Sequence, residues 1–308
     1  MDGAAVVKFT NVEAEATAGT KNGFRIGPIA GNSPVTLTGV TAKSANAEGI
    51  VALTVADSAI TVDGFSTATG ATNGIQGALF SGTAAFVVSH STGTGGTGNG
   101  IRAGSFSGAG ASFSVTACEA LSPTGPGAIA IATWTTGGTA TITDTIATAL
   151  DGVLISGVTA GVIGLNNVTA TGTGAARSGV KLANIGAATA VTLTDVVATG
   201  TTEYGLWALT VSGATIDVVS STISGATEGA LFDVLTNTPV TFTGSAITSG
   251  VTKTAVVLKG STDSSVAFAT STFLQYDVLN CNLQTLTIDG GAGIPTGTIV
   301  HVKDTTLT

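Results

Sequence analysis

Short blocks in which apolar residues alternate with Thr, Ser or another polar residue recur along the whole chain. Examples are VTLT at 35–38, VTLT at 191–194 and VTFT at 240–243. A period of two residues predicts strands with one buried face, and Gly, Asn or Asp after each block predicts a sharp turn. Good helix formers other than Ala are scarce, so the pattern predicts β-structure with almost no helix.

The blocks recur at a nearly constant distance of about 25 residues, and only the last steps are shorter. A second marker, a Gly followed by an apolar residue, repeats with the same period. The block centres, which we expect to point inward, are Phe9, Leu37, Val62, Val88, Val115, Ile142, Leu165, Leu193, Val218, Phe242, Phe268, Ile288 and Val302. The glycines of the second marker are Gly23, Gly49, Gly74, Gly100, Gly127, Gly152, Gly179, Gly205 and Gly229.

The stretches Asn22-Gly23-Phe24, Asn73-Gly74-Ile75 and Asn99-Gly100-Ile101, each with the Val/Thr strand that follows, carry a resemblance to a known family. The chain resembles the right-handed parallel β-helices of the pectin-lyase-like family. The prediction is an all-β fold, a single right-handed parallel β-helix of about 12–13 coils with a period near 25 residues. Residues 1–308 would form one domain, with the last two coils, about 270–308, irregular. The family includes polysaccharide lyases and hydrolases, tailspikes, adhesins and structural proteins, so the resemblance implies a fold more than a function.

Composition narrows the class of protein. Hydrophobic residues make up 43 % of the chain and charged residues 9 %, so the many glycines do not indicate disorder. No run of eighteen apolar residues occurs, which predicts no membrane insertion. A net charge of −8 argues against nucleic acid as a partner. The start, MDGAAVVKFT, lacks the pattern of a secretion signal, yet the Thr/Ala/Gly/Ser bias leads us to expect a bacterial or viral protein at the cell surface or outside the cell.

The candidate chemistry is sparse. The acids are dispersed along the chain, and His90 and His301 are the only histidines. The enzymes of the resembled family use clustered acids, so we predict no catalytic residues, no cofactor, no metal site and no enzyme activity. Corner residues such as Asp144 and Asp195 are expected to hydrogen-bond within turns. Cys118 and Cys281 lie too far apart for a disulfide and are expected to be free thiols in or near the core.

Three surfaces are candidate contact sites. The first is an outward face of Thr-x-Thr pairs, which resembles the faces of ice-binding β-helices: Thr36, Thr38, Thr141, Thr143, Thr192, Thr194, Thr241 and Thr243. The second is a lateral apolar face, unless loops cover it or the assumed register is off by one residue: Ile129, Leu154, Trp207 and Leu231. The third consists of the two terminal strands, whose unpaired edges could stack on another copy: Val6, Val7, Phe9, Ile299, Val300 and Val302.

These features predict a non-catalytic structural or adhesive surface protein that associates with copies of itself, end to end or laterally, into a filament, sheath or surface array. An alternative is an extracellular β-helix that binds or cleaves a carbohydrate, with a glycan as its partner. A second alternative is an ice-binding β-solenoid that uses the Thr-x-Thr face.

Overall fold

A computed structural model of the chain describes residues 5–250, 254–283, 285–288 and 299–307. Within them every regular element is a β-strand, and no helical segment has the length and hydropathy of a bilayer crossing. The chain divides into two compact units, Met1–Leu150 (unit 1) and Asp151–Thr308 (unit 2), and the division lies within the strand β16 (Thr139–Ser156). The prediction of one domain over 1–308 stays a prediction.

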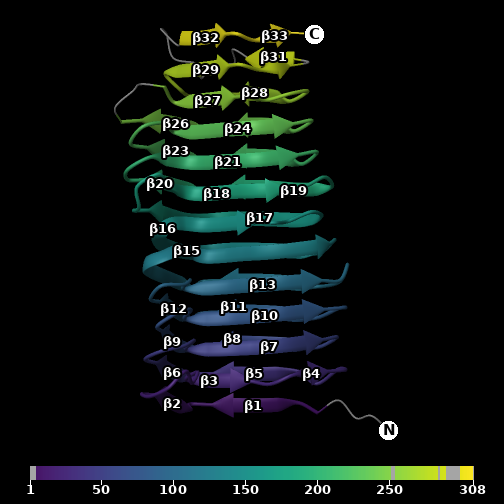
Figure 1. The fold of residues 1–308 in the computed structure, drawn as a ribbon, viewed down its shortest axis with the longest axis vertical. Helices are drawn as coiled ribbons and strands as arrows, with labels where there is room; N and C mark the ends of the chain where they lie inside the picture. The colour runs from purple at the N-terminus through teal and green to yellow at the C-terminus, as the bar shows by residue number, and fades with distance from the viewer. Residues whose placement is uncertain (1–4, 251–253, 284, 289–298, 308) are drawn as a thin grey trace. The chain divides into compact units, whose positions relative to one another are not determined.

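In unit 1 each coil contributes strands to three columns, and within a column every strand pairs in parallel with its equivalent on the next coil (Figure 1). Column A, the Val/Thr strands, contains β1 (Val7–Thr10), β5 (Val35–Thr38), β8 (Ala59–Asp63), β11 (Ala85–Ser89), β14 (Ser112–Thr116) and the start of β16. Column B contains β2 (Glu13–Ala16), β6 (Thr41–Ser44), β9 (Thr67–Gly70), β12 (Thr92–Gly95) and the start of β15 (Glu119–Thr136). Column C contains β3 (Phe24–Ile26), β4 (Ile29–Ala30), β7 (Ile50–Ala56), β10 (Ile75–Ser81), β13 (Ile101–Ser107) and the end of β15.

Unit 2 repeats the same three columns. Column A contains the start of β17 (Gly161–Gly172), β19 (Thr189–Thr194), β22 (Thr215–Val219), β25 (Pro239–Thr243), β28 (Ser265–Ala269) and β31 (Thr285–Ile288). Column B contains the end of β17, β20 (Val197–Gly200), β23 (Thr222–Gly225) and β26 (Ala246–Ser249). Column C contains the end of β16, β18 (Ser178–Ile185), β21 (Tyr204–Ser212), β24 (Ala230–Thr236), β27 (Val256–Lys259), β29 (Gln275–Leu279) and β32 (Ile299–Lys303). β30 (Asn282–Leu283) and β33 (Thr306–Leu307) form a separate parallel pair.

This arrangement confirms the predicted all-β parallel β-helix. The described residues form about 11 coils with a period near 26 residues, against an expected 12–13 coils. One reason for the difference is Val302, which was counted as the centre of a further column A strand. Val302 lies in β32 and pairs with Val278 of column C. Much of the irregular end expected after residue 270 falls on residues 284 and 289–298, outside the described residues.

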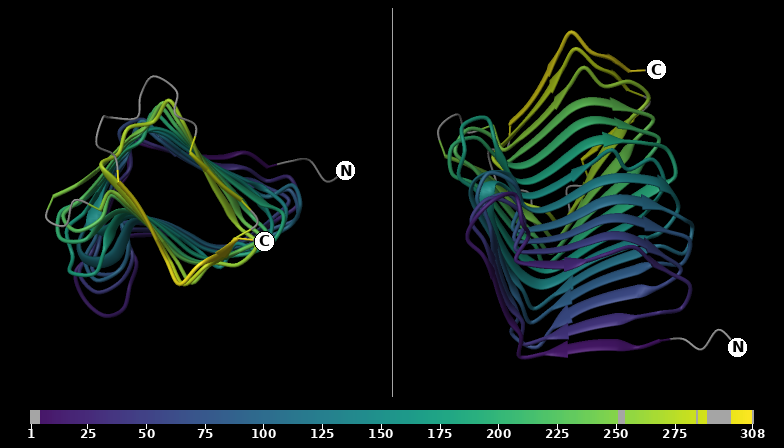
Figure 2. Two further views of the ribbon diagram at one scale, coloured as in Figure 1. Left: turned by 90° about the horizontal axis from the view of Figure 1, so that it is seen from above. Right: turned by 60° about the horizontal axis from the view of Figure 1, so that its bottom comes forward.

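The interior of each unit is filled by side chains stacked on their equivalents one coil away, and Figure 2 shows that neighbouring coils within a unit follow nearly the same path. In unit 1, Phe106 is stacked on Phe80, with ring centroids 4.9 Å apart, and on Trp134, at 4.7 Å. In unit 2, Phe242 is stacked on Phe268 at 5.1 Å. Aromatic columns of this kind bury large apolar areas and hold neighbouring coils in register.

The corner after column A has left-handed backbone conformation on every described coil. The expectation of Asn, Asp or Gly, which tolerate positive φ, is confirmed at seven of these twelve corner positions, and Phe, His, Ala, Ser or Thr occupies the other five. The corner residues in unit 1 are Asn11, Gly39, Gly64, Phe65, His90, Ala117 and Asp144, and those in unit 2 are Asn167, Asp195, Ser220, Gly244 and Thr270.

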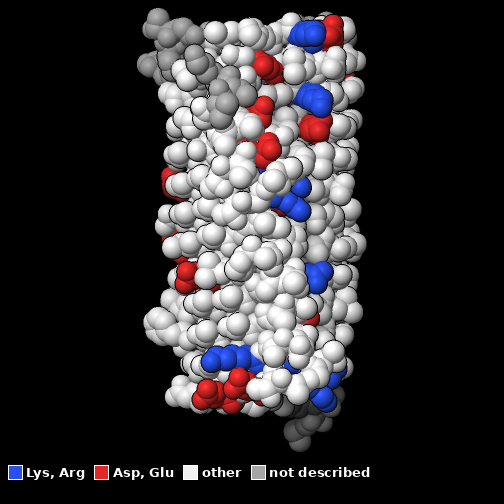
Figure 3. Space-filling model, turned by 60° about the vertical axis from the view of Figure 1, so that its left-hand side comes forward, with Lys and Arg blue, Asp and Glu red and all other residues white. Residues whose placement is uncertain are grey.

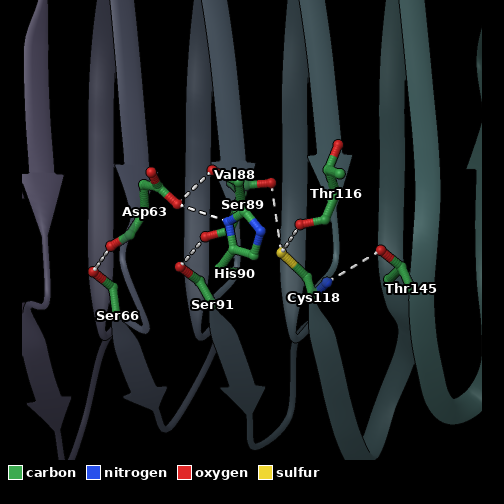
Figure 4. A network of polar contacts seen from close by, with 9 residues as sticks. All are labelled: Asp63, Ser66, Val88, Ser89, His90, Ser91, Thr116, Cys118 and Thr145. Atoms are coloured by element: carbon green, nitrogen blue, oxygen red, sulfur yellow. Dashed lines mark hydrogen bonds and ion pairs between the residues drawn. The ribbon is translucent and has the colours of Figure 1, made fainter.

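A buried column of hydroxyl groups lies directly after this corner and satisfies its backbone. In unit 1 the column is formed by Ser66, Ser91, Cys118 and Thr145, one on each of four coils (Figure 4). Ser91 donates to the Ser89 carbonyl at 2.6 Å, and Thr145 accepts the Cys118 N–H at 3.3 Å. In unit 2, Ser221, Ser245 and Ser271 do the same, each accepting an N–H from the preceding coil. Buried backbone donors at the bend therefore keep partners.

Cys118 occupies one position of this hydroxyl column, with its thiol in the place of a hydroxyl. Its Sγ lies 3.2 Å from the Thr116 carbonyl oxygen and 3.5 Å from that of Val88. Cys281 in unit 2 makes equivalent contacts with the carbonyls of Leu279 and Leu258. Both are buried free thiols, as predicted, and burial raises the pKa of each. The thiolate form that reacts with electrophiles is therefore disfavoured.

We predict that truncating the aromatic column is costly while truncating an exposed ring is not. Phe106→Ala should lower the free energy of unfolding by roughly 3–5 kcal/mol, because Phe106 is 1 % exposed and its loss opens a cavity. Phe65→Ala should change it by less than about 1 kcal/mol, since Phe65 is 86 % exposed. Urea unfolding followed by tryptophan fluorescence measures both values, and equal losses would contradict this account of the core.

We also predict that iodoacetamide modifies Cys118 and Cys281 in the native protein roughly tenfold or more slowly than in urea, because both thiols are buried hydrogen-bond donors. Mass spectrometry of the adducts over time measures each rate. Rapid native modification of either cysteine would contradict its placement in the buried column.

Candidate functional site

Unit 1 carries a groove of about 430 Å³ on the outer side of the corner between columns A and B. It crosses four coils, and Ser91 and Cys118 of the buried hydroxyl column contribute to its lining. It is lined by Phe65, Thr67, His90, Ser91, Thr92, Ala117, Cys118, Glu119, Asp144 and Ile146. These residues come from three ranks, that is, sets of equivalent positions on successive coils: the corner residues, the buried residues directly after the corner, and the first outward residues of column B.

The groove has open space at Ala117, where the corner residue has a small side chain. Ala117 occupies the corner between His90 on one neighbouring coil and Asp144 on the other. Its methyl group leaves open the space that a longer side chain would fill. At the two ends the side chains are larger and apolar, with Phe65 and Ile146 exposed at 86 % and 53 %.

Phe65 projects because its corner is one residue longer than its neighbours. Asp63 and Ser66 are separated by two residues, Gly64 and Phe65, whereas Ser89 and Ser91 are separated by His90 alone. Both Gly64 and Phe65 have left-handed backbone, with φ of 67° and 62°. The added residue places an aromatic ring outside the coil, with its centroid 6.4 Å from that of His90.

Asp63 and His90 are in hydrogen-bonding contact with each other at this end of the groove. Asp63 Oδ1 lies 3.1 Å from His90 Nδ1 and accepts the Ser89 hydroxyl at 2.8 Å (Figure 4). The Gly64 backbone N–H, followed by the Ser89 and His90 side chains, lowers the pKa of Asp63. A carboxylate on Nδ1 favours the tautomer that carries the proton there, which leaves Nε2 as the acceptor of the neutral ring.

Two further acids, Glu119 and Asp144, line the groove, and both are exposed. The acids were predicted to be dispersed because Asp63, Glu119 and Asp144 are far apart along the chain. Parallel stacking brings positions about 26 residues apart to adjacent coils, so the three acids and His90 gather on one corner. Carboxylates and an imidazole are groups that accept and donate protons in acid–base catalysis. Among the described residues, no three acids, histidines or cysteines are placed to hold a metal ion together.

The Thr-x-Thr pairs lie on the outward positions of column A, all partly or fully exposed. In unit 1 the register adds Thr10, Thr61, Ser89, Ser114 and Thr116 to the same two ranks, and these are interrupted by Lys8, Asp63 and Val87. Hydroxyl groups thus dominate this face of unit 1. Ice binding through it stays a prediction.

The lateral face needs a correction at one position. Ile129 is fully buried, because it pairs with buried Ile101, and Ala130 takes the outward position opposite Arg102. The marker Gly127 lies one residue too early on this coil, so the assumed register was off by one. Leu154, Trp207 and Leu231 are half-buried at outward positions. The ammonium group of Lys181 lies 3.8 Å from the centroid of the Trp207 ring and so covers part of this apolar face. A role of these residues in lateral contact stays a prediction.

The terminal strands expose the apolar residues named from the sequence. Val6 and Val7 are 59 % and 40 % exposed, and Ile299, Val300 and Val302 are 48 %, 37 % and 49 % exposed. Phe9 is half-buried against Phe24, with ring centroids 5.0 Å apart. End-to-end association with another copy stays a prediction.

No protein-family model matches the chain, and no curated protein matches its sequence. The following two are among the solved structures that are similar to it. One is the A-module of a mannuronan C-5 epimerase from Azotobacter vinelandii, with a TM-score of 0.47 and 12 % identity over 99 % of this chain and 90 % of that one. The other is a surface adhesin of Streptococcus pneumoniae, with a TM-score of 0.24 and 7 % identity over 99 % of this chain and 85 % of that one. Likeness at this level assigns no activity.

The prediction that the chain is not an enzyme is withdrawn, because one of these similar structures belongs to an epimerase and likeness at this level neither assigns nor excludes an activity. The prediction rested on dispersed acids, and the structure removes that premise for Asp63, Glu119 and Asp144. We do not carry the prediction forward.

We predict that Asp63 contributes to the acid sensitivity of unit 1. Because the folded state lowers its pKa, its contacts stabilise the fold above the unfolded pKa of about 3.9, and this contribution is lost as pH falls through the lower folded value. The stability difference between the unmodified protein and Asp63→Asn should therefore be present at pH 7 and shrink below about pH 4. Urea unfolding from pH 3 to pH 7 measures it.

Ser89→Ala removes one donor to the carboxylate and should show a smaller loss with the same pH dependence. If the difference in the free energy of unfolding between Asp63→Asn and the unmodified protein does not change with pH, the assignment of this acid sensitivity to Asp63 is wrong.

Proposed function

We propose that the chain is an extracellular β-helix that binds a glycan along the groove of unit 1. The observation that carries this proposal is the exposed ring of Phe65 at the end of a hollow lined with hydroxyl and carboxyl groups. A soluble protein does not gain stability by projecting a Phe side chain into water, and an exposed aromatic beside a polar hollow is typical of a contact surface.

A sugar ring matches these groups chemically. The C–H groups on one face of a pyranose form an apolar surface that packs against the electron-rich face of an aromatic ring. Its hydroxyl groups both donate and accept hydrogen bonds. Glu119 and Asp144 supply acceptors, and Thr67 and Thr92 supply hydroxyl groups that do both.

The groove has the dimensions of a short oligosaccharide. Phe65, His90, Ala117 and Asp144 come from four successive coils, and coils stack about 4.8 Å apart, so the corner rank spans about 14 Å. Because the backbone repeats at each coil, a linear polymer lying across the coils would meet equivalent backbone positions at each step, with a different corner side chain on each coil.

The same groove contains groups that transfer protons. His90, oriented by Asp63, presents Nε2 as an acceptor, and the carboxyl groups of Glu119 and Asp144 belong to the residue types that act as acids and bases on glycans. Binding is therefore measured first, and every glycan that binds is then assayed for reducing ends, unsaturated products and altered stereochemistry.

We predict that Phe65→Ala weakens binding of the best ligand from an array of neutral, amino and acidic oligosaccharides by about tenfold, because the stacking surface is lost. Ala117→Phe should weaken binding at least as much by filling the groove, and the left-handed corner already accommodates a Phe at residue 65. Isothermal titration calorimetry measures both affinities.

The matched control is Leu79→Ala, which removes a 43 % exposed apolar side chain from β10 of the same unit, away from the groove. Its affinity should equal that of the unmodified protein. Unchanged affinity in both Phe65→Ala and Ala117→Phe would place glycan binding elsewhere and overturn the proposal.

A further inference from the structure

The charged side chains in and beside the groove are mostly acidic. Glu119 and Asp144 line it as exposed acids, and Asp63 adds a third carboxylate behind His90. None of the described residues that line the groove is Lys or Arg. Lysine and arginine are scarce elsewhere too, and Figure 3 shows wide areas without any charged residue. The lining thus contributes two carboxylates and no Lys or Arg side chain.

We infer that the groove selects glycans that carry free amino groups and disfavours those that carry carboxylates, and this inference rests on the proposed glycan binding. A protonated amino sugar presents a C–H face for Phe65 and an ammonium group for Glu119 or Asp144. An ammonium group beside an aromatic ring also gains a cation–π contact. A uronate would place its carboxylate against like charges, which is unfavourable at any distance shorter than the screening length of about 10 Å at 0.1 M salt.

The test uses three trimers of similar size with the full-length protein: a glucosamine trimer, an N-acetylglucosamine trimer and a mannuronate trimer. At low salt the glucosamine trimer should bind about fivefold more tightly than the acetylated one, as expected for two exposed ion pairs, and the mannuronate trimer should bind most weakly. Added salt should reduce the affinity for the glucosamine trimer and leave the affinity for the acetylated trimer nearly unchanged.

The double variant Glu119→Gln/Asp144→Asn removes both acids and keeps the size of the side chains. It should bind the glucosamine and acetylated trimers equally, and retained binding of the acetylated trimer shows that it is folded. The matched control is Glu13→Gln/Glu15→Gln, which removes two acids of β2 in the same unit but outside the groove, and it should keep the fivefold preference.

If the unmodified protein binds the glucosamine and acetylated trimers equally, and Phe65→Ala binds neither, the inferred charge selection is wrong. The proposed glycan binding at the groove would still stand. Tightest binding of the mannuronate trimer would overturn the charge selection as well. Failure of all three trimers to bind, with binding of another glycan of the array that is lost in Phe65→Ala, would overturn the inference and leave the proposed function standing. Failure of every glycan of the array would overturn the proposed function.

Discussion

Every coil must meet the next in parallel main-chain hydrogen bonds, and this requirement determines the rest of the structure. In-register pairing places Leu37 on Val62, Val88 on Val115 and Leu193 on Val218, so each position of the repeat has one environment from coil to coil. The bend after column A must then occur at the same point on every coil. The bend requires a residue with left-handed backbone conformation, and the buried N–H that follows requires a hydrogen-bond acceptor. The hydroxyl column provides that acceptor.

Because stacking constrains most positions of the repeat, a functional site is expected where one coil differs from its neighbours. Left-handed backbone at His90 is not itself a sign of a site, because Asn11, Asp195 and Thr270 have it at equivalent corners. The additional residue at Gly64-Phe65 and the small side chain of Ala117 are different, since they change the surface without changing the ladder. The corner tolerates both because its hydrogen bonds come from the backbone and from the residue after the bend, not from the corner side chain.

The fold was predictable from sequence because its determinants repeat: inward Val, Leu or Phe in column A, and a Gly before column C. The register failed at Ile129, where the Gly marker moves by one residue, and the coil count failed at Val302, where a strand of another column has the same alternation. Local pattern alone does not distinguish two columns that share a period of two. Buried contacts such as the stacking of Phe106 on Trp134 decide the register, and they depend on residues in separate coils.

The groove was not predictable by searching for acids close together in sequence, although a signal was present. Residues that share a corner are one period apart, so Asp63 and His90 are 27 residues apart and Asp144 lies two coils further. Aligning the chain by coil would have shown His90, Ala117 and Asp144 in one rank, and the additional residue at Phe65 as a local break in spacing. The volume of the hollow was not available from this alignment, because it depends on how far each side chain projects. In a solenoid, therefore, chemical groups should be compared by position within the repeat, since stacking brings together residues that distance along the chain separates.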